Sequence, residues 1–209
     1  MRLSREELMR AADSRFTPQI HSRLLEAKVA IAGLGGLGSN TALMLARCNV
    51  GHMLLVDFDV VDITNLNRQA YRISHIGRKK TEALKEMIQE INPYLDIMTL
   101  SEKVTRENAV SLFGEYPIVC EAFDSSIEKA MLVNTLLENC PNTRIVSGSG
   151  MAGYGDSNTI HTRRRMKNLY ICGDEVSDVE DGIGLMAPRV AICAGHQANL
   201  IVRMILNEE

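Results

Sequence analysis

The part of this sequence best suited to chemistry is a glycine-rich segment that follows a short apolar run. Gly33, Gly35 and Gly38 have the spacing G-x-G-x-x-G, and Gly36 adds a further glycine. Glycines permit the unusual backbone angles of such a turn and let a phosphate approach closely, where the amides of the next helix can hold it. Asp57 follows the next apolar run, close to the spacing of a ribose-binding carboxylate. The segment predicts a nucleotide site, and the alternative is a tight structural turn.

Further acidic and polar residues lie where open parallel sheets place their ligands, just past the carboxyl ends of strands. Asp59 comes directly after the second apolar run, and Asp124 stands between a later apolar run and the start of a helix. The loop after Asp59 is polar and carries, in order, Asp62, Asn65, Asn67, Arg68 and Gln69.

Three successive cations, Arg78, Lys79 and Lys80, stand at the start of a predicted helix. Cations favour helix C-termini, so this cluster opposes the helix macrodipole. A polyanion bound nearby would remove the conflict. A solvated basic helix end is an equally good interpretation, and the sequence leaves both open.

Apolar runs alternate with helical patterns, which predicts an α/β fold with a Rossmann-like, doubly wound and largely parallel sheet. The expected strands are 29–32, 53–56, 94–100, 117–120 and 144–147. The expected helices are Arg5–Asp13 behind a capping box, a short helix within 14–27, one from residue 39 or 40 to about 48, and then 81–91, 105–113, 126–139 and 189–206. A glycine-rich crossover loop at about 148–184 is expected to hold a strand at 159–161 and a basic turn at 163–165. This divides the chain into an N-terminal helical segment, 1–27, and a single domain, 28–209.

The composition is that of an ordinary globular protein. The chain has 209 residues, of which 45% are hydrophobic and 23% charged, and its formal net charge is −3. This charge gives no reason to expect nucleic acid or an anionic membrane as a partner. We expect a cytoplasmic protein, because there is no apolar run of membrane-spanning length and the N-terminus is too charged for a signal peptide. The five cysteines form no C-x-x-C pair, so we expect reduced thiols and no zinc.

The ordered set of motifs resembles the ThiF/MoeB/HesA family, the adenylating enzymes of sulfur-carrier proteins and relatives of the ubiquitin-activating enzymes. The chain is most similar to the short ThiF-type proteins of thiamine biosynthesis, and the resemblance covers about residues 15 to 206. The matching blocks are GLGGLGS (33–39), LLVDFDVV (54–61), TNLNRQ (64–69), the block from Gly77 to Lys80, VCEAFDSS (119–126), SGSGMAGYG, and LMAPRV with AGHQAN.

The resemblance implies a reaction in which ATP adenylates the C-terminal glycine carboxylate of a small ubiquitin-like sulfur carrier with a Gly-Gly tail, releasing pyrophosphate. It also implies a homodimer. The implied catalytic residues are Arg68 and Lys80, which bind phosphate, and Asp124, which is associated with Mg²⁺ at the phosphates. Asp57 matches the ribose-binding acid. The remaining residues implied in the ATP site are Gly33, Gly35, Gly36, Gly38, Asp59, Asn65, Gln69 and Ser125.

Two positions depart from the family pattern. An N-terminal arginine that enters the partner subunit's site in family members is replaced here by Pro18, so Arg15 or Arg23 would have to substitute for it. Cys172 lies near the position of a zinc ligand in other members, although no zinc is expected here. We interpret Cys172 as a partly buried structural thiol. A catalytic thiol in a mobile loop is the weaker interpretation.

Three other functions fit parts of the sequence. A nicotinamide-dependent oxidoreductase would use the same glycine turn and Asp57, but it leaves Arg68, Lys80 and Asp124 without a task. A non-catalytic scaffold that binds a carrier tail is motivated by the missing N-terminal arginine. A relative that modifies tRNA or adenylates a peptide would keep the fold and change the acceptor. The acidic charge balance disfavours tRNA.

Overall fold

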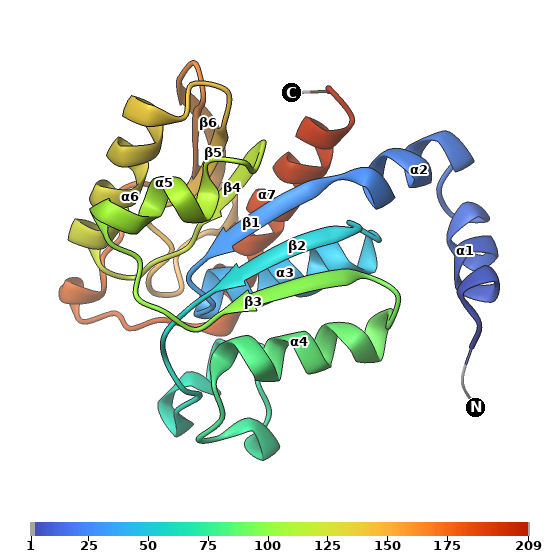
Figure 1. The fold of residues 1–209 in the computed structure, drawn as a ribbon. Coiled ribbons are helices and arrows are strands. Elements are labelled where there is room, and N and C mark those ends of the chain that lie inside the picture. The colour runs from blue at the N-terminus through green and yellow to red at the C-terminus, as the bar shows by residue number, and fades with distance from the viewer. Residues whose placement is uncertain (1–2, 209) are drawn as a thin grey trace.

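The computed structural model of this chain describes residues 3–208 (Figure 1). Helix α1 (Arg5–Asp13) begins behind the predicted capping box, in which Ser4 and Glu7 bond each other's backbone N–H groups. Helix α2 (Pro18–Glu26) begins with a proline at its first position, capped by the Thr17 hydroxyl. Pro18 is thus a helix-starting residue, which suits its fixed φ and its missing N–H.

One seven-stranded sheet forms the centre of the molecule, in the order β3-β2-β1-β4-β5-β7-β6. Each neighbouring pair is parallel except β6 and β7, which are antiparallel. The strand order reverses between β1 and β4, so the sheet is doubly wound, as predicted. The strands are β1 (Lys28–Ala32), β2 (His52–Val56), β3 (Asp96–Leu100), β4 (Ile118–Glu121), β5 (Arg144–Gly148), β6 (His161–Met166) and β7 (Leu169–Gly173).

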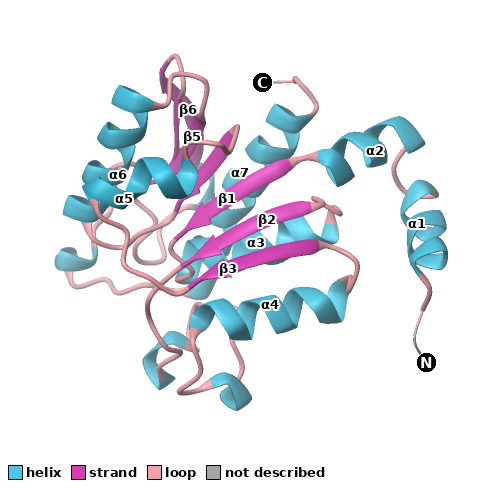
Figure 2. Cartoon of the chain, viewed as in Figure 1, coloured by secondary structure: helices cyan, strands magenta, loops and turns pink. Residues whose placement is uncertain are grey.

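Helices cover both faces of this sheet (Figure 2). The α-helices that follow β1 are α3 (Gly36–Arg47), α4 (Lys80–Ile91), α5 (Arg106–Phe113), α6 (Ser126–Asn139) and α7 (Ala187–Ile205). The short 3-10 turns are η1 (Ile63–Asn65), η2 (Ile73–His75), η3 (Ser157–Thr159) and η4 (Val179–Asp181). Helices α3, α4 and α7 share one hydrophobic cluster with the sheet, while α5 and α6 share the other.

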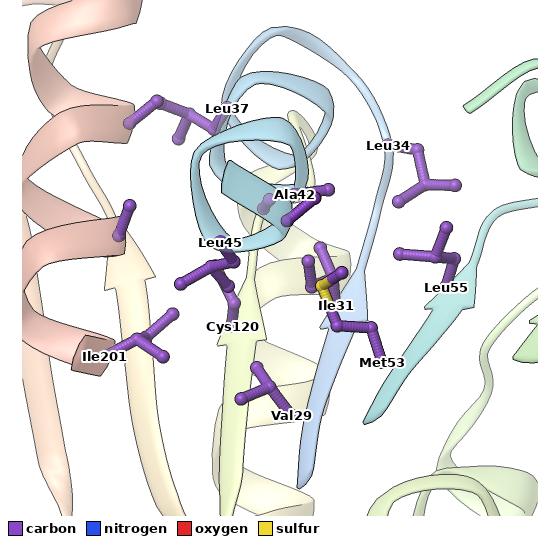
Figure 3. Packing of buried hydrophobic residues seen from close by; sticks show 14 of the residues in the cluster. Val29, Ile31, Leu34, Leu37, Ala42, Leu45, Met53, Leu55, Cys120 and Ile201 are labelled. Atoms are coloured by element: carbon purple, nitrogen blue, oxygen red, sulfur yellow. The ribbon is translucent and has the colours of Figure 1, made fainter. Parts of the chain in front are cut away.

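Alternate residues of the central strand divide between the two clusters. Val29 and Ile31 of β1 point toward α3 and α7, where they lie among Leu45 and Ile201 (Figure 3). Ala30 and Ala32 belong to the cluster under α5 and α6. Since β1 is buried on both sides, its sequence shows a continuous apolar run and no polar alternation.

The structure corrects two predicted boundaries. Helix α3 begins at Gly36, inside the glycine turn, and not at residue 39 or 40. The stretch predicted as a crossover loop contains β6 and β7, and the predicted basic turn at 163–165 is part of β6. Strand β6 was missed because its residues are exposed, so it has no apolar signal.

The arginines of β6 find partners on neighbouring elements, which explains a strand of this composition. Arg163 and Arg165 both pair with Glu175, and Arg164 lies over the ring of Tyr170. Charged side chains on an edge strand also discourage pairing with other chains. Within residues 3–208, no helix is long and apolar enough to cross a membrane.

Candidate active site

A cavity of about 400 Å³ opens at the carboxyl ends of the central strands. Its lining comes from the loops after β1, β2, β3, β4, β5 and β7 and from the start of α3, α4, α6 and α7. This is the point where the strand order reverses, the usual ligand site of a doubly wound sheet. The volume lies within the range of small-molecule sites, which runs from about 300 to 1,000 Å³.

The glycine turn forms the floor of this cavity. Gly33 has φ +88°, and a Cβ there would lie 2.9 Å from the backbone of Ala122. A Cβ on Gly38 would lie 1.9 Å from the carbonyl oxygen of Gly33, so this glycine lets α3 pack against the turn. Gly35 and Gly36 line the cavity at the start of α3, whose free N–H groups suit an anion.

Asp57, the predicted ribose-binding residue, ties the glycine turn to the loop after β2. Its two carboxylate oxygens accept backbone N–H groups, from Leu34 at 2.7 Å and from Asp59 at 2.8 Å. The side chain is only 8% exposed, and burial raises its pKa although the ammonium of Lys80 acts in the opposite direction. Each oxygen retains a lone pair, so Asp57 can hold the loop and still accept a ligand hydroxyl.

Lys80 connects the acidic residues after β2 to helix α4. Its Nζ lies 2.7 Å from Asp59 Oδ2 and 3.9 Å from Asp57 Oδ2. The other two cations of the predicted basic cluster pair with acids of the same helix, Arg78 with Glu86 and Lys79 with Glu82. Protein carboxylates thus neutralise this helix start, and of its three cations Lys80 alone lines the cavity.

The polar loop after Asp59 presents Arg68 and Gln69 to the cavity. Arg68 donates to the Thr64 carbonyl at 3.1 Å and to Asn67 Oδ1 at 2.9 Å, which restricts its guanidinium. Gln69 Oε1 is buried and has no hydrogen-bond partner among residues 3–208, so it is available to a ligand donor. Asn65 instead accepts the N–H of Asp62 and stabilises the loop from outside the cavity.

Asp124 enters the cavity from the turn between β4 and α6. Its side chain is exposed, and within residues 3–208 nothing hydrogen-bonds or pairs with its carboxylate. Ser125 is the N-cap of α6 and accepts the N–H of Glu128 at 3.3 Å, so its hydroxyl serves the helix. No three His, Cys, Asp or Glu side chains of the described chain are grouped to hold a metal ion. One free carboxylate fits Mg²⁺, which is commonly held by one or two carboxylates together with substrate phosphates.

The cavity thus brings together nine of the twelve residues predicted for the ATP site and omits three. Gly38, Asn65 and Ser125 support the turn, the loop and the helix from outside the lining. The nine in the lining are Gly33, Gly35, Gly36, Asp57, Asp59, Arg68, Gln69, Lys80 and Asp124.

The lining residues that were not predicted from the sequence include two phenylalanines and two lysines. Phe58 and Phe123 add aromatic surface, and the ammonium of Lys103 lies 5.7 Å from the centre of the Phe58 ring. Lys129 lines the same wall and pairs with buried Glu121 at 2.6 Å. The two phenylalanines had a signal in the sequence, because they neighbour the predicted Asp57 and Asp124. Lys129 lies within a helix and had none.

Cys172 lies in β7 and is completely buried, so the prediction of a mobile loop at this position is wrong. Burial raises the pKa of its thiol to about 11, and the Thr162 hydroxyl lowers it by a smaller amount. Asp174 and Glu175, the acids that follow Cys172 in the sequence, pair with arginines. A buried, protonated thiol is a poor nucleophile, which supports the structural interpretation.

Neither arginine proposed to replace the one missing at Pro18 lines the cavity. Both lie in the N-terminal segment, which runs into the start of β1, at the end of the sheet away from the cavity (Figure 1). Arg23 donates to the carbonyl of Ile205 at 2.8 Å and thereby caps α7. Arg15 is exposed in the turn between α1 and α2.

A doubly wound sheet with a glycine turn, cations and a free carboxylate around one cavity defines a nucleotide-binding α/β protein. The family comparison is more specific, because the ThiF family model matches residues 8–209. The chain belongs to the ThiF family, which confirms the predicted fold class and the predicted resemblance.

Individual relatives include enzymes with different acceptors. The chain is 36% identical over 134 residues to the adenylyltransferase and sulfurtransferase UBA4 of Candida glabrata, covering 64% of this chain and 30% of UBA4. It is 33% identical over 137 residues to the tRNA threonylcarbamoyladenosine dehydratase of Haemophilus influenzae, covering 65% and 52%. The chain therefore spans only a third to a half of these curated relatives.

Among solved structures, the E. coli tRNA N6-threonylcarbamoyladenosine dehydratase TcdA in complex with ATP superposes with a TM-score of 0.87. The match covers 100% of this chain and 98% of that one, at 21% identity. E. coli MccB in complex with AMPCPP and MccA has a TM-score of 0.71, covering 91% and 59% at 20% identity. At these identities the likeness establishes the fold.

Proposed function

We propose that this protein is an adenylyltransferase that uses ATP to activate a carboxylate and releases pyrophosphate. The observation that carries the proposal is the grouping of Arg68, Lys80 and Asp124 around the glycine turn in one cavity. A carboxylate that attacks the α-phosphate brings one anion onto another, so cations must offset the charge. The nicotinamide alternative leaves these three side chains without a role.

Each residue has a distinct task in this proposal. The start of α3 holds phosphate through its N–H groups, and Arg68 and Lys80 neutralise the leaving pyrophosphate. Asp57 and Asp59 accept the ribose hydroxyls. Asp124 would hold Mg²⁺, which neutralises charge at the phosphates when bound. Catalysis then consists of positioning and charge stabilisation, without a nucleophilic side chain.

For the acceptor we propose a small ubiquitin-like sulfur carrier with a Gly-Gly tail, of the ThiS type used in thiamine thiazole synthesis. The motif resemblance and the match to UBA4, named as adenylyltransferase and sulfurtransferase, support this choice. Only glycines lack a side chain, so a Gly-Gly tail suits a narrow approach to the α-phosphate. A homodimer is a further proposal, which rests on the family resemblance alone.

A second acceptor has its own support. The TcdA match covers nearly the full length of both chains, and a Haemophilus relative is named for the same tRNA reaction. A tRNA carrying N6-threonylcarbamoyladenosine offers a carboxylate that ATP could activate in the same cavity. The net charge of −3 favours the protein carrier, because tRNA binding calls for a basic surface.

Pyrophosphate exchange with both acceptors tests the proposal. Purified protein with ATP, Mg²⁺ and radiolabelled pyrophosphate is incubated with a Gly-Gly carrier, with the modified tRNA, or with neither. We expect the carrier to stimulate exchange and the tRNA to have no effect. Stimulation by the tRNA alone would replace the carrier with the second acceptor. ATP binding without exchange in any mixture would favour the non-catalytic scaffold.

A further inference from the structure

A buried ion pair on one wall of the cavity has no role in the proposed function so far. Lys129 Nζ lies 2.6 Å from Glu121 Oε2, and Lys129 also lines the cavity. The side chain of Glu121 is 0% exposed and that of Lys129 is 21% exposed. Lys129 belongs to α6, whereas Lys80 belongs to α4, and these helices cover opposite faces of the sheet. The cavity therefore has cations on two opposed sides.

Glu121 positions Lys129, and both carboxylate oxygens of Glu121 also accept hydrogen bonds from other groups. Its Oε2 also accepts the Ser147 hydroxyl at 2.5 Å, and its Oε1 accepts the Phe123 N–H at 2.7 Å. These contacts tie the carboxylate to the ends of β4 and β5. An ammonium has three N–H donors, and within residues 3–208 Glu121 is the hydrogen-bond partner of Lys129. Two donors remain for a ligand in the cavity.

The geometry of the reaction indicates which ligand this is. During adenylation a carboxylate oxygen of the acceptor bonds to the α-phosphorus, and the bond from that phosphorus to the bridging oxygen breaks. Pyrophosphate leaves with the electron pair, and no proton is transferred. In an in-line displacement the attacking and leaving oxygens lie on opposite sides of the phosphorus. If Arg68 and Lys80 hold the leaving group, the attacking carboxylate enters from the side of Lys129.

We propose that Lys129 binds the carboxylate of the acceptor, and that Glu121 is a positioning residue that acts through it. The inference rests on the proposed adenylation and adds the residue that recognises the acceptor's charge. It separates two tasks in the cavity. The cations on the α3 and α4 side bind the nucleotide, and Lys129 on the α6 side binds the group to be activated.

The first test separates acceptor binding from ATP binding in Lys129→Gln. We expect the KM for a Gly-Gly carrier to rise about tenfold or more, since a hydrogen bond to a charged group is lost. The Kd for MgATP, measured by calorimetry, should stay within about twofold of wild type, because the phosphate contacts remain. Lys129→Arg should restore most of the carrier affinity. Lys28→Gln is the matched control, because Lys28 is exposed at the opposite end of β1.

A second variant removes the risk that Lys129→Gln unfolds by leaving Glu121 unpaired. The double variant Glu121→Gln, Lys129→Gln removes both charges and keeps an acceptor for Ser147. It should fold and show the same loss of carrier affinity. A double variant that folds and binds the carrier as wild type does would mean that the ion pair is purely structural, which would overturn the inference.

The most direct readout uses a carrier whose terminal carboxylate is replaced by a carboxamide, in binding titrations with ATP. The change should weaken binding to wild type but have little further effect on Lys129→Gln, because both changes remove the same contact. Equal and additive losses in the two proteins would overturn the inference while leaving adenylation intact. If neither acceptor stimulates pyrophosphate exchange by wild type, the proposed function itself fails, and this inference fails with it.

Discussion

The ammonium of Lys80 lies between two carboxylates, 2.7 Å from that of Asp59 and 3.9 Å from that of Asp57, with 7% of the lysine side chain exposed. The same lysine faces the cavity in which we place the phosphates of ATP. Lys80 therefore has two partners of the same sign, the acids beside it and the nucleotide. Its loss should affect both folding and binding.

Lys80→Met should lower stability as well as activity. Removing one partner of a buried ion pair costs about 3–5 kcal/mol, and we expect about 3 kcal/mol here because Asp59 is 48% exposed. Lys79→Met is the matched control, since Lys79 is 55% exposed and should change stability by less than about 0.5 kcal/mol. Urea unfolding of both variants measures the difference. Equal losses would show that the pairing of Lys80 contributes nothing beyond an ordinary surface charge.

Two glycines of the same turn should respond differently to alanine. In Gly38→Ala the new Cβ would meet the Gly33 carbonyl oxygen at 1.9 Å, so the turn or α3 must move. We expect a loss of about 3 kcal/mol or more, at the upper end of overpacking costs. In Gly35→Ala the nearest atom to the new Cβ is Gln69 Nε2 at 3.8 Å, so the fold should persist.

The Gly35→Ala protein should nevertheless bind ATP weakly, because its new methyl group lies where the phosphates approach the backbone. Thermal unfolding gives the stability of each variant, and calorimetric titration with MgATP gives the affinity. Unchanged ATP affinity in a folded Gly35→Ala protein would mean that the phosphates do not lie against this turn.

The buried thiol of Cys172 should make stability depend on pH in the alkaline range. Burial raises its pKa from 9.0 to about 11, so the folded chain holds this proton more tightly than the unfolded chain does. The resulting stabilisation is complete below pH 9.0 and is lost as the pH rises to about 11. At 1.36 kcal/mol per unit, the loss is about 3 kcal/mol.

Comparison with Cys172→Ala isolates this effect from all other titrations. The free energy of unfolding of wild type should fall more steeply between pH 9 and pH 11 than that of the variant. Parallel curves would show that the thiol is not protected in the folded chain. At neutral pH the variant should retain acceptor-dependent exchange, because the proposed adenylation uses no nucleophilic side chain.

Local signals made much of this fold predictable. The Ser4–Glu7 capping box marked the start of α1, and the apolar runs marked the five parallel strands at the core. The G-x-G-x-x-G spacing located the floor of the cavity because the steric demand at Gly33 and Gly38 leaves few other residues possible. The capping box, the apolar runs, the positive φ of Gly33 and the contact of Gly38 with Gly33 depend on neighbours in sequence, which explains why they could be read from it.

What the sequence did not reveal depends on how neighbouring segments turn toward one another in the folded chain. The pairing of Glu121 and Lys129 requires α6 to fold back over the end of β4, and neither residue belongs to a periodic pattern. Strand β6 is stabilised by pairing with β7, and its own residues are exposed and charged. Asn65 and Ser125 have the polar character of ligand contacts, but in the folded chain their side chains bond the backbone of their own turns.

The central claim is that the cavity transfers AMP from ATP to a carboxylate, and the transfer can be observed directly. ATP radiolabelled at its α-phosphate is incubated with the protein, Mg²⁺ and a Gly-Gly carrier, and label on the carrier is measured after rapid acid quenching. We expect acid-stable label that is released as AMP by mild base, and its loss in Arg68→Ala and in Asp124→Ala. An unlabelled carrier, or equal labelling by wild type and both variants, would contradict adenylation in this cavity.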